Sequence, residues 1–164
     1  MAKKHNDLPI QQVTDLNPND NYRIGIDPDT TASGIAIFNR RTKQYEAYYR
    51  IAFFDLFDLL DNLLKYGYKF EVVIEAGWRN PSKMHNVKGY ATRAKAAAIG
   101  ANVGANHECG RKIVEMCQYF GTEPWLLTPT SSKWTPTMLH HLTNIELSAN
   151  QQDIIDAMRL VYEQ

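Results

Sequence analysis

The order of the predicted elements assigns the chain to the α/β class. Three strands precede a helix, and a fourth strand, a helical region, a fifth strand and a final helix follow. Residues 53–66 carry apolar side chains at the three- and four-residue spacing of an amphipathic helix. Residues 69–75 are apolar in their second half, which is typical of a strand in the middle of a sheet. These patterns predict an α/β domain.

The first three strands are predicted at residues 22–27, 33–39 and 44–51. Pro28 begins a turn after the first strand, and the polar segment 40–43 joins the second strand to the third. Short polar connections of this kind join antiparallel neighbours, so we expect the three strands to form a meander.

The second half of the chain is predicted to be mainly helical. Residues 87–120 are rich in alanine and form one long helix or two, since Gly100 and Gly104 indicate either close helix packing or a break. Ser148 or Asn150 would cap the last helix. The predicted elements after the meander are a helix at 53–66, a strand at 69–75, a loop at 77–86, a strand at 124–128, a turn or helix from Pro129, and a helix at 149–162.

The composition is that of a folded cytosolic domain. The 164 residues are 44% hydrophobic and 22% charged, which suits one globular domain rather than a disordered chain. We expect residues 1–21, which are polar, to be a flexible tail and residues 22–164 to be a single domain. Cys109 and Cys117 are too few for a disulfide framework, and no apolar stretch approaches the roughly 20 residues of a membrane span. We therefore expect a cytoplasmic protein without a membrane partner.

Four acidic residues occur where they could meet at one point. Asp27 and Glu75 each end an apolar strand, and Asp153 and Asp156 lie three apart, so they project from one face of the last helix. Carboxylates grouped without partners would repel one another, so such a cluster indicates a site for hard divalent cations. Oxygen ligands favour Mg²⁺ or Mn²⁺ over Zn²⁺.

A carboxylate site of this kind predicts phosphoryl-transfer chemistry on a nucleic acid or nucleotide. Two divalent ions about 4 Å apart activate a water and stabilise the leaving oxygen. Asp27 would bridge the ions, Glu75 would bind one, and Asp156 with Asp153 would complete the other side. Each residue also has an ordinary structural interpretation, such as a turn former for Asp27 or a favourable helix-start charge for Asp153. The four together indicate function more strongly than any one alone.

The charges are unevenly distributed along a chain whose formal net charge is zero. Seven cations and a single acid, Glu108, lie between residues 79 and 112. A basic segment is typical of a nucleic-acid contact, although the solvated face of a helix would give the same pattern. The cations are Arg79, Lys83, Lys88, Arg93, Lys95, Arg111 and Lys112.

Three short motifs follow one another in a specific order. They are Ile-Gly-Ile-Asp-Pro-Asp-Thr-Thr-Ala-Ser-Gly at 24–34, Val-Ile-Glu at 73–75 and Asp-Ile-Ile-Asp-Ala at 153–157. Small residues recur at 99–104, and Pro129 is followed four residues later by Lys133. In this order the motifs resemble the RuvC-type Holliday junction resolvases of the RNase H-like superfamily, over nearly the entire chain. The compact chain would suit a version from a phage or mobile element.

This resemblance implies an RNase H-like fold, with a five-stranded mixed sheet in the order 3-2-1-4-5 flanked by helices. It implies a homodimer that resolves four-way DNA junctions by paired nicks, each made by phosphodiester hydrolysis with two Mg²⁺ ions, for which Mn²⁺ would substitute. Lys133 matches a family lysine near the scissile phosphate, where it would counter developing negative charge; an ordinary surface lysine is the alternative. The matching metal-binding positions are Asp27, Glu75, Asp153 and Asp156.

The resemblance also implies DNA contacts. Trp78 stands where family members carry an aromatic residue that enters the junction core, and an exposed Trp beside Arg79 suits stacking on an unpaired base; core packing is the alternative. Asp29 replaces the usual glycine of the Asp-Pro-Gly turn, and His140 and His141 replace family lysines as phosphate contacts or surface residues. The predicted DNA contacts are Trp78, Arg79, Lys83, Lys88, Arg93 and Lys133.

Three other functions agree with parts of the pattern. The sugar-kinase, actin and chaperone ATPases also begin with a strand, an Asp and a phosphate-binding turn, but they need two such lobes and a much longer chain. A related nuclease would act on flaps, forks or RNA–DNA hybrids. A non-catalytic protein would bind branched DNA through the basic segment, but it would not need all four acids.

Overall fold

Five strands form one mixed sheet in the order β3-β2-β1-β4-β5. The computed structural model describes residues 15–80 and 93–162. The strands β1 (Asn21–Asp27), β2 (Ser33–Asn39) and β3 (Gln44–Ile51) form an antiparallel meander. On the other side of β1, β4 (Lys69–Glu75) and β5 (Trp125–Leu127) run parallel to it. The predicted meander and the predicted strand order are both confirmed.

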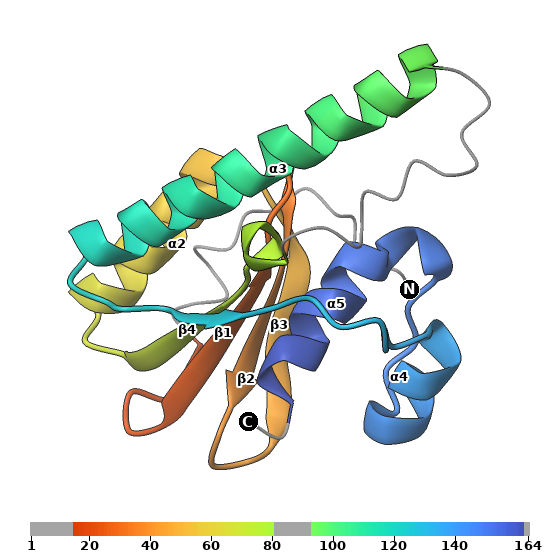
Figure 1. The fold of residues 1–164 in the computed structure, drawn as a ribbon. Coiled ribbons are helices and arrows are strands. Elements are labelled where there is room, and N and C mark those ends of the chain that lie inside the picture. Colours follow the sequence, from red (N-terminus) through yellow and green to blue (C-terminus); the bar gives the residue numbers. More distant parts are fainter. Residues whose placement is uncertain (1–14, 81–92, 163–164) are drawn as a thin grey trace.

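Helices cover both faces of this sheet (Figure 1). The helices α2 (Phe53–Lys65) and α3 (Arg93–Tyr119) pack on one face, and α4 (Pro136–Thr143) and α5 (Gln152–Val161) pack on the other. Two short 3₁₀ turns, η1 (Gly77–Arg79) and η3 (Ala149–Gln151), follow β4 and precede α5, respectively. Within residues 15–80 and 93–162, no helix is both long and apolar enough to cross a membrane.

Side chains alternate along β1 and β4, which decides the face of the sheet toward which each residue points. Ile26 and Ile74 belong to the core under α2 and α3, whereas Val73 packs with α5 on the opposite face. Successive side chains of a strand point to opposite faces. Asp27 and Glu75, which follow Ile26 and Ile74, therefore belong to the α5 face at the ends of their strands.

Most element boundaries agree with the sequence. The strands at 33–39, 44–51 and 69–75 lie at the predicted residues, and α2 ends one residue before the predicted limit. The alanine-rich region is a single helix from residue 93, and Gly100 and Gly104 neither break it nor pack closely, since a Cβ at either position would meet nothing within 4 Å. Ser148, and not Asn150, caps the last helical segment, with Gln151 completing a capping box.

The predicted tail of residues 1–21 is too long. Leu16 is part of the hydrophobic core, and Asp20 is buried with hydrogen bonds from Asn39 and Arg41. The Tyr22 hydroxyl donates to the Asn17 carbonyl at 3.0 Å, which ties this segment to β1. The packed domain therefore begins before Tyr22, and the part of the predicted tail at residues 1–14 lies outside the described residues.

Candidate active site

Two acids end neighbouring parallel strands at the same edge of the sheet. Asp27 is the last residue of β1 and Glu75 the last of β4, and the two strands pair in parallel up to Ile26 and Ile74. The charge of Glu75 raises the pKa of Asp27, because the two carboxyl groups lie close together.

Two glycines bring α5 into direct contact with the sheet. A Cβ on Gly25 of β1 would lie 2.2 Å from the carbonyl oxygen of Ala157, and a Cβ on Gly34 of β2 would lie 2.2 Å from that of Asp153. These two carbonyls are four residues apart, which is about one turn of an α-helix. One turn of α5 therefore rests on bare strand backbone, and this contact fixes the acids of α5 beside the end of β1.

Asp156 lies in the interior, with only 1% of the residue exposed. Lys133 forms an ion pair with its Oδ2, and Gln152 Nε2 donates to its Oδ1 at 2.9 Å. The same Gln152 amide donates to the carbonyl of Trp134 at 2.9 Å. The carboxylate is thus held by one charged and one neutral donor, as a buried charge requires.

Glu75 is also buried and also has a cationic partner. Arg159 Nη2 donates to Glu75 Oε1 at 3.0 Å, and Arg159 Nη1 donates to Thr130 Oγ1 at 3.1 Å. Arg159 follows Asp156 by three residues, so both side chains lie on one face of α5. This residue was missed from the sequence, although its spacing from Asp156 was a signal that could have found it.

Asp153 has a different environment from the other three acids. Arg50 of β3 forms an ion pair with it, with Nη2 2.8 Å from Oδ1, and 21% of the Asp153 side chain is exposed. Arg50 also donates to the carbonyl of Asn150. The structure therefore brings Asp27, Glu75 and Asp156 together with Lys133, and it places Asp153 at the outer edge of this group.

The clustered acids change one another's pKa values. Burial raises the pKa of Asp27 well above its usual range, and the charges of Glu75 and Asp156 raise it further. Burial also raises the pKa of Glu75, against the lowering effect of Lys133. Burial alone would lower the pKa of Lys133, but the hydrogen bond to Asp156 and the surrounding carboxylates outweigh it, so that pKa is raised. Each of these acids would gain from a bound cation.

The donor set fits a hard divalent ion, but the described residues are not arranged around one. Carboxylate oxygens are the ligands that Mg²⁺ and Mn²⁺ prefer. Among residues 15–80 and 93–162, no group of three or more His, Cys, Asp or Glu side chains has the arrangement to hold a metal ion. Lys133 and Arg159 lie where they neutralise Asp156 and Glu75. The residues that could hold a metal are Asp27, Glu75 and Asp156, with Asp153 nearby.

A cavity of about 160 Å³ opens beside the two strand-end acids. It lies between the strand ends and α3, which contributes Asn106 and His107. Asn106 Nδ2 donates to Asp29 Oδ2 at 3.2 Å, and the other Asp29 oxygen accepts from the Thr31 amide at 2.8 Å. Asp29 therefore holds this turn against α3. The cavity is lined by Asp27, Pro28, Glu75, Gly77, Trp78, Val103, Asn106, His107 and Pro129.

Trp78 lies at this cavity and is half-buried on α3. A Cβ on Gly110 would lie 2.4 Å from the Trp78 ring, and the Arg111 guanidinium lies 5.7 Å from the ring centroid. The ring therefore has a packing role in this structure. The adjacent Arg79 is exposed and donates from Nη1 to the Leu126 carbonyl at 3.3 Å.

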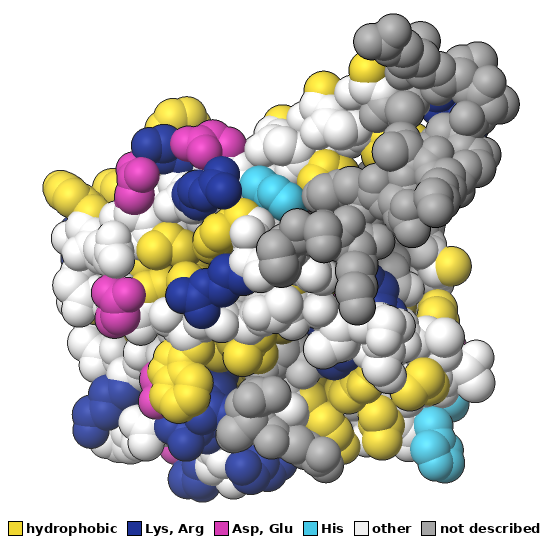
Figure 2. Space-filling model, in the orientation of Figure 1, with side chains coloured by type: hydrophobic (Ala, Val, Ile, Leu, Met, Phe, Trp, Pro, Cys, Tyr) yellow, Lys and Arg dark blue, Asp and Glu magenta, His cyan; other side chains and the backbone are white. Residues whose placement is uncertain are grey.

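The other predicted DNA contacts are less defined. Lys83 and Lys88 lie outside the described residues, and Arg93 begins α3 without a described side chain. Further along α3, Arg111 and Lys112 form ion pairs with Glu108 and Glu115. Figure 2 shows the Lys and Arg side chains of one face in separate groups, one of them interspersed with acids. The basic segment is therefore partly neutralised where it is described.

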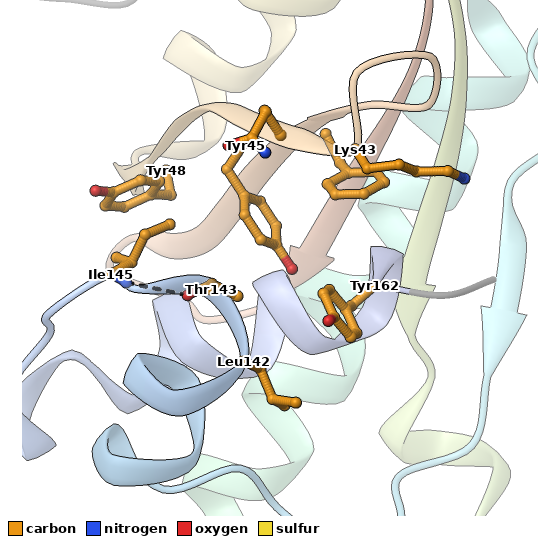
Figure 3. Close-up of a pocket in the computed structure, with 9 residues that line it drawn as sticks. Lys43, Tyr45, Tyr48, Leu142, Thr143, Ile145 and Tyr162 are labelled. Carbon is orange, nitrogen blue, oxygen red and sulfur yellow. Dashed lines mark hydrogen bonds between the residues drawn. The ribbon is translucent and has the colours of Figure 1, made fainter.

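A larger cavity, of about 520 Å³, lies at the other end of the sheet (Figure 3). It includes Phe38 of β2, which pairs with Arg23 near the start of β1, whereas the acids lie at the end of β1. Tyr45 reaches from β3 to α5, where its hydroxyl donates to the Met158 carbonyl at 2.8 Å. The lining contains no carboxylate, so the smaller cavity is the better candidate for catalysis.

Comparison with known proteins supports the fold. No family model and no curated protein sequence matches the chain. Among solved structures, T. thermophilus RuvC in complex with a Holliday junction substrate is similar over 86% of this chain and 90% of that chain, with a TM-score of 0.51 and 11% sequence identity. At this identity the likeness establishes the RNase H-like fold, with its five-stranded mixed sheet flanked by helices.

Proposed function

We propose that the chain is a metal-dependent endonuclease that resolves four-way DNA junctions. The observation that carries this proposal is the convergence of Asp27, Glu75 and Asp156 at the ends of two parallel strands and one helix of an RNase H-like fold. The structure that shares this fold binds a Holliday junction. A buried group of carboxylates has a high electrostatic cost, which a divalent ion at the site would offset.

Asp27, Glu75 and Asp156 would hold the divalent ions, Mg²⁺ or Mn²⁺, with Asp153 as an outer fourth acid. Two such ions activate a water and stabilise the leaving oxygen in phosphodiester hydrolysis. The contribution of the chain is to hold the carboxylates together in the interior. Because burial raises the pKa of Asp27 and of Glu75, these groups would release protons when a cation binds.

Lys133 lies in the segment after β5 and supplies a positive charge beside Asp156. Its ammonium group pairs with Asp156, and about half of its side chain is exposed. A partly exposed lysine can reach a phosphate while it stays close to the buried acids. We assign Lys133 to the stabilisation of charge on the scissile phosphate.

We assign DNA contacts to Trp78 and Arg79 beside the cavity, and to Lys83, Lys88 and Arg93. Arg79 is exposed and close to Glu75 in sequence, so it suits a phosphate contact. For Trp78, entry of its ring into the junction core requires the ring to leave its contact with Gly110. Stacking on an unpaired base would then replace that packing.

We also propose that the active form is a homodimer, because two incisions are needed to resolve a junction. The N-terminal part of α3 extends past the sheet (Figure 1), and both Gly100 and Gly104 face open space. Small residues on a helix allow another helix to approach closely. This part of α3 is therefore the surface that we assign to the second copy.

The decisive experiment is cleavage of a synthetic four-way junction by the purified chain in MgCl₂ or MnCl₂. We expect paired, symmetric nicks, and we expect Asp27→Asn to bind the junction but not to cut it, because phosphate contacts supply most of the affinity. Flap, fork and linear duplex DNA serve as parallel substrates. Junction binding without cleavage by the unaltered chain in either metal would refute the nuclease, and equal cleavage of flaps and forks would assign a broader branched-DNA substrate.

A further inference from the structure

Arg159 is a positive charge held inside the carboxylate cluster. Its guanidinium bridges Glu75 and Thr130 through Nη2 and Nη1, at 3.0 and 3.1 Å. Only 16% of its side chain is exposed, against 9% for Glu75, so the ion pair is largely removed from water. Its Nε atom is buried and has no hydrogen-bond partner among the described residues.

This guanidinium already neutralises a carboxylate that a metal ion would need. Glu75 Oε1 accepts from Arg159, and the positive guanidinium repels a divalent ion that approaches the same carboxylate. Removal of a cation from a buried carboxylate is costly unless another cation replaces it. Arg159 and a divalent ion are therefore competitors for Glu75.

We propose that Arg159 is the resident counter-cation of Glu75, which a divalent ion must displace, so that Arg159 sets the metal affinity of the site. The inference rests on the proposed function, because it takes Glu75 as a metal ligand. Thr130 provides an anchor for the displaced side chain, since the Nη1 bond does not involve Glu75. The unpaired Nε shows that the guanidinium lacks a complete set of hydrogen bonds, which lowers the cost of its release.

A supporting role for Arg159 predicts the opposite result. If the guanidinium only oriented Glu75 toward a metal ion, its removal would weaken metal binding, as removal of a residue that orients a metal ligand does. If it competes with the metal, its removal strengthens binding, because the ion no longer has to displace a cation from Glu75. The direction of the change therefore separates the two roles.

The test is calorimetric titration of the full chain with MgCl₂ and with MnCl₂, in the absence of DNA. We expect Arg159→Gln to bind the ion about tenfold more tightly than the unaltered chain, a typical size for coupling between two ligands. Arg159→Lys keeps the positive charge and should stay within about threefold of the unaltered chain. Lys65→Gln, which removes the exposed Lys65–Asp61 pair on α2, should leave the affinity unchanged. Equal or weaker binding by a folded Arg159→Gln variant would overturn the inference.

A second measurement uses the unaltered chain, in case Arg159→Gln does not fold. The NMR resonance of the Arg159 Nε–H group, assigned by its loss in Arg159→Lys, should shift with the same midpoint as Mg²⁺ binding. A resonance that stays constant through saturation contradicts displacement. If the unaltered chain binds no divalent ion and cuts no DNA, the proposed function fails as well; if it binds metal and cuts DNA while Arg159→Gln binds no more tightly, only this inference fails.

Discussion

Asp156 and Asp153 lie three residues apart on the same turn of α5, yet their surroundings differ. Asp156 is almost fully buried beside the ends of β1 and β4 and is held by Lys133 and Gln152. The Asp153 side chain is 21% exposed, and it pairs with Arg50, whose side chain is about half exposed. An exposed ion pair contributes little to stability, whereas a buried charge depends strongly on its partners.

This difference shows that a three-residue spacing on a helix predicts a shared face but not a shared environment. An interval of three residues places two side chains on one helix face, but that face is wide enough to lie across more than one strand. Gly34, under Asp153, belongs to β2, and Gly25, under Ala157, belongs to β1. Asp153 is therefore nearer to β3 and Arg50, and Asp156 is nearer to the strand-end acids.

The largest expected effect is on the rate of junction cleavage, which should fall far more in Asp156→Asn than in Asp153→Asn. We expect Asp156→Asn to lower the rate of junction cleavage by about 10³-fold, which is the upper range for loss of one electrostatic group in an active site. Asp153→Asn should lower it by about tenfold or less, because Arg50 already engages this carboxylate. Single-turnover cleavage rates in MgCl₂ measure both. Equal losses would mean that Asp153 leaves Arg50 and joins the metal site.

The second expected effect is on the free energy of unfolding, and it comes from a substitution in the contact that holds both acids in place. Gly34→Ala would place a methyl group 2.2 Å from the Asp153 carbonyl and 2.9 Å from the Ile154 amide nitrogen, so α5 must move. We expect the free energy of unfolding to fall by about 3 kcal/mol, as for overpacked interiors. Urea denaturation followed by circular dichroism measures the change.

Gly100→Ala is the matched control for this substitution. Gly100 lies within α3, and in a single copy of the chain the added methyl group meets nothing, so both variants are compared at concentrations where the chain is monomeric. Alanine favours a helix over glycine by about 0.5–1 kcal/mol, and we therefore expect a small gain in stability. A loss at Gly34 no larger than the change at Gly100 would contradict the close contact between α5 and the sheet.

The smallest expected effect concerns pH. The raised pKa of Asp27 means that the unfolded chain loses its proton first as the pH rises from about 4. The metal-free protein should therefore lose stability from about pH 4 up to the folded pKa of Asp27. Asp27→Asn should remove part of this loss and should have the higher melting temperature at about pH 7 in EDTA, but not at about pH 4.

The same titration compares the two acids of α5. The Asp156 charge raises the pKa of Asp27 more than the Asp153 charge does. Asp156→Asn should therefore flatten the dependence of melting temperature on pH more than Asp153→Asn. A pH profile that is the same for Asp27→Asn and the unaltered chain would show that Asp27 does not titrate in this range.

Local patterns were sufficient to predict most of the fold. The apolar runs and turn residues located β2, β3 and β4 at their observed residues, because strand ends coincide with polar connections. The burial of Leu16 and Asp20 was not predictable, since their partners, such as Tyr68 and Arg41, are remote in sequence. The uninterrupted course of α3 through Gly100 and Gly104 likewise depends on the rest of the helix rather than on the two glycines.

The sequence indicated that Asp27, Glu75, Asp156 and Lys133 lie together, but it did not indicate Arg50 or Arg159. Asp27 and Glu75 end apolar strands, a signal that is visible in the sequence. The partners Arg50 and Arg159 are 103 and 84 residues from Asp153 and Glu75, so nothing local indicates those pairs. The role of Asp29 in holding the turn to Asn106 is also a long-range contact, 77 residues apart.

The contact of α5 with Gly25 and Gly34 has a consequence for how such sequences can diverge. At these two positions any side chain would displace the helix, whereas the outward-facing positions of α5 have no such restriction. We expect random mutagenesis with selection for a folded, cutting protein to retain glycine at 25 and 34 as strictly as the acids themselves. The positions that tolerate no substitution would then include residues that shape the site but take no part in its chemistry.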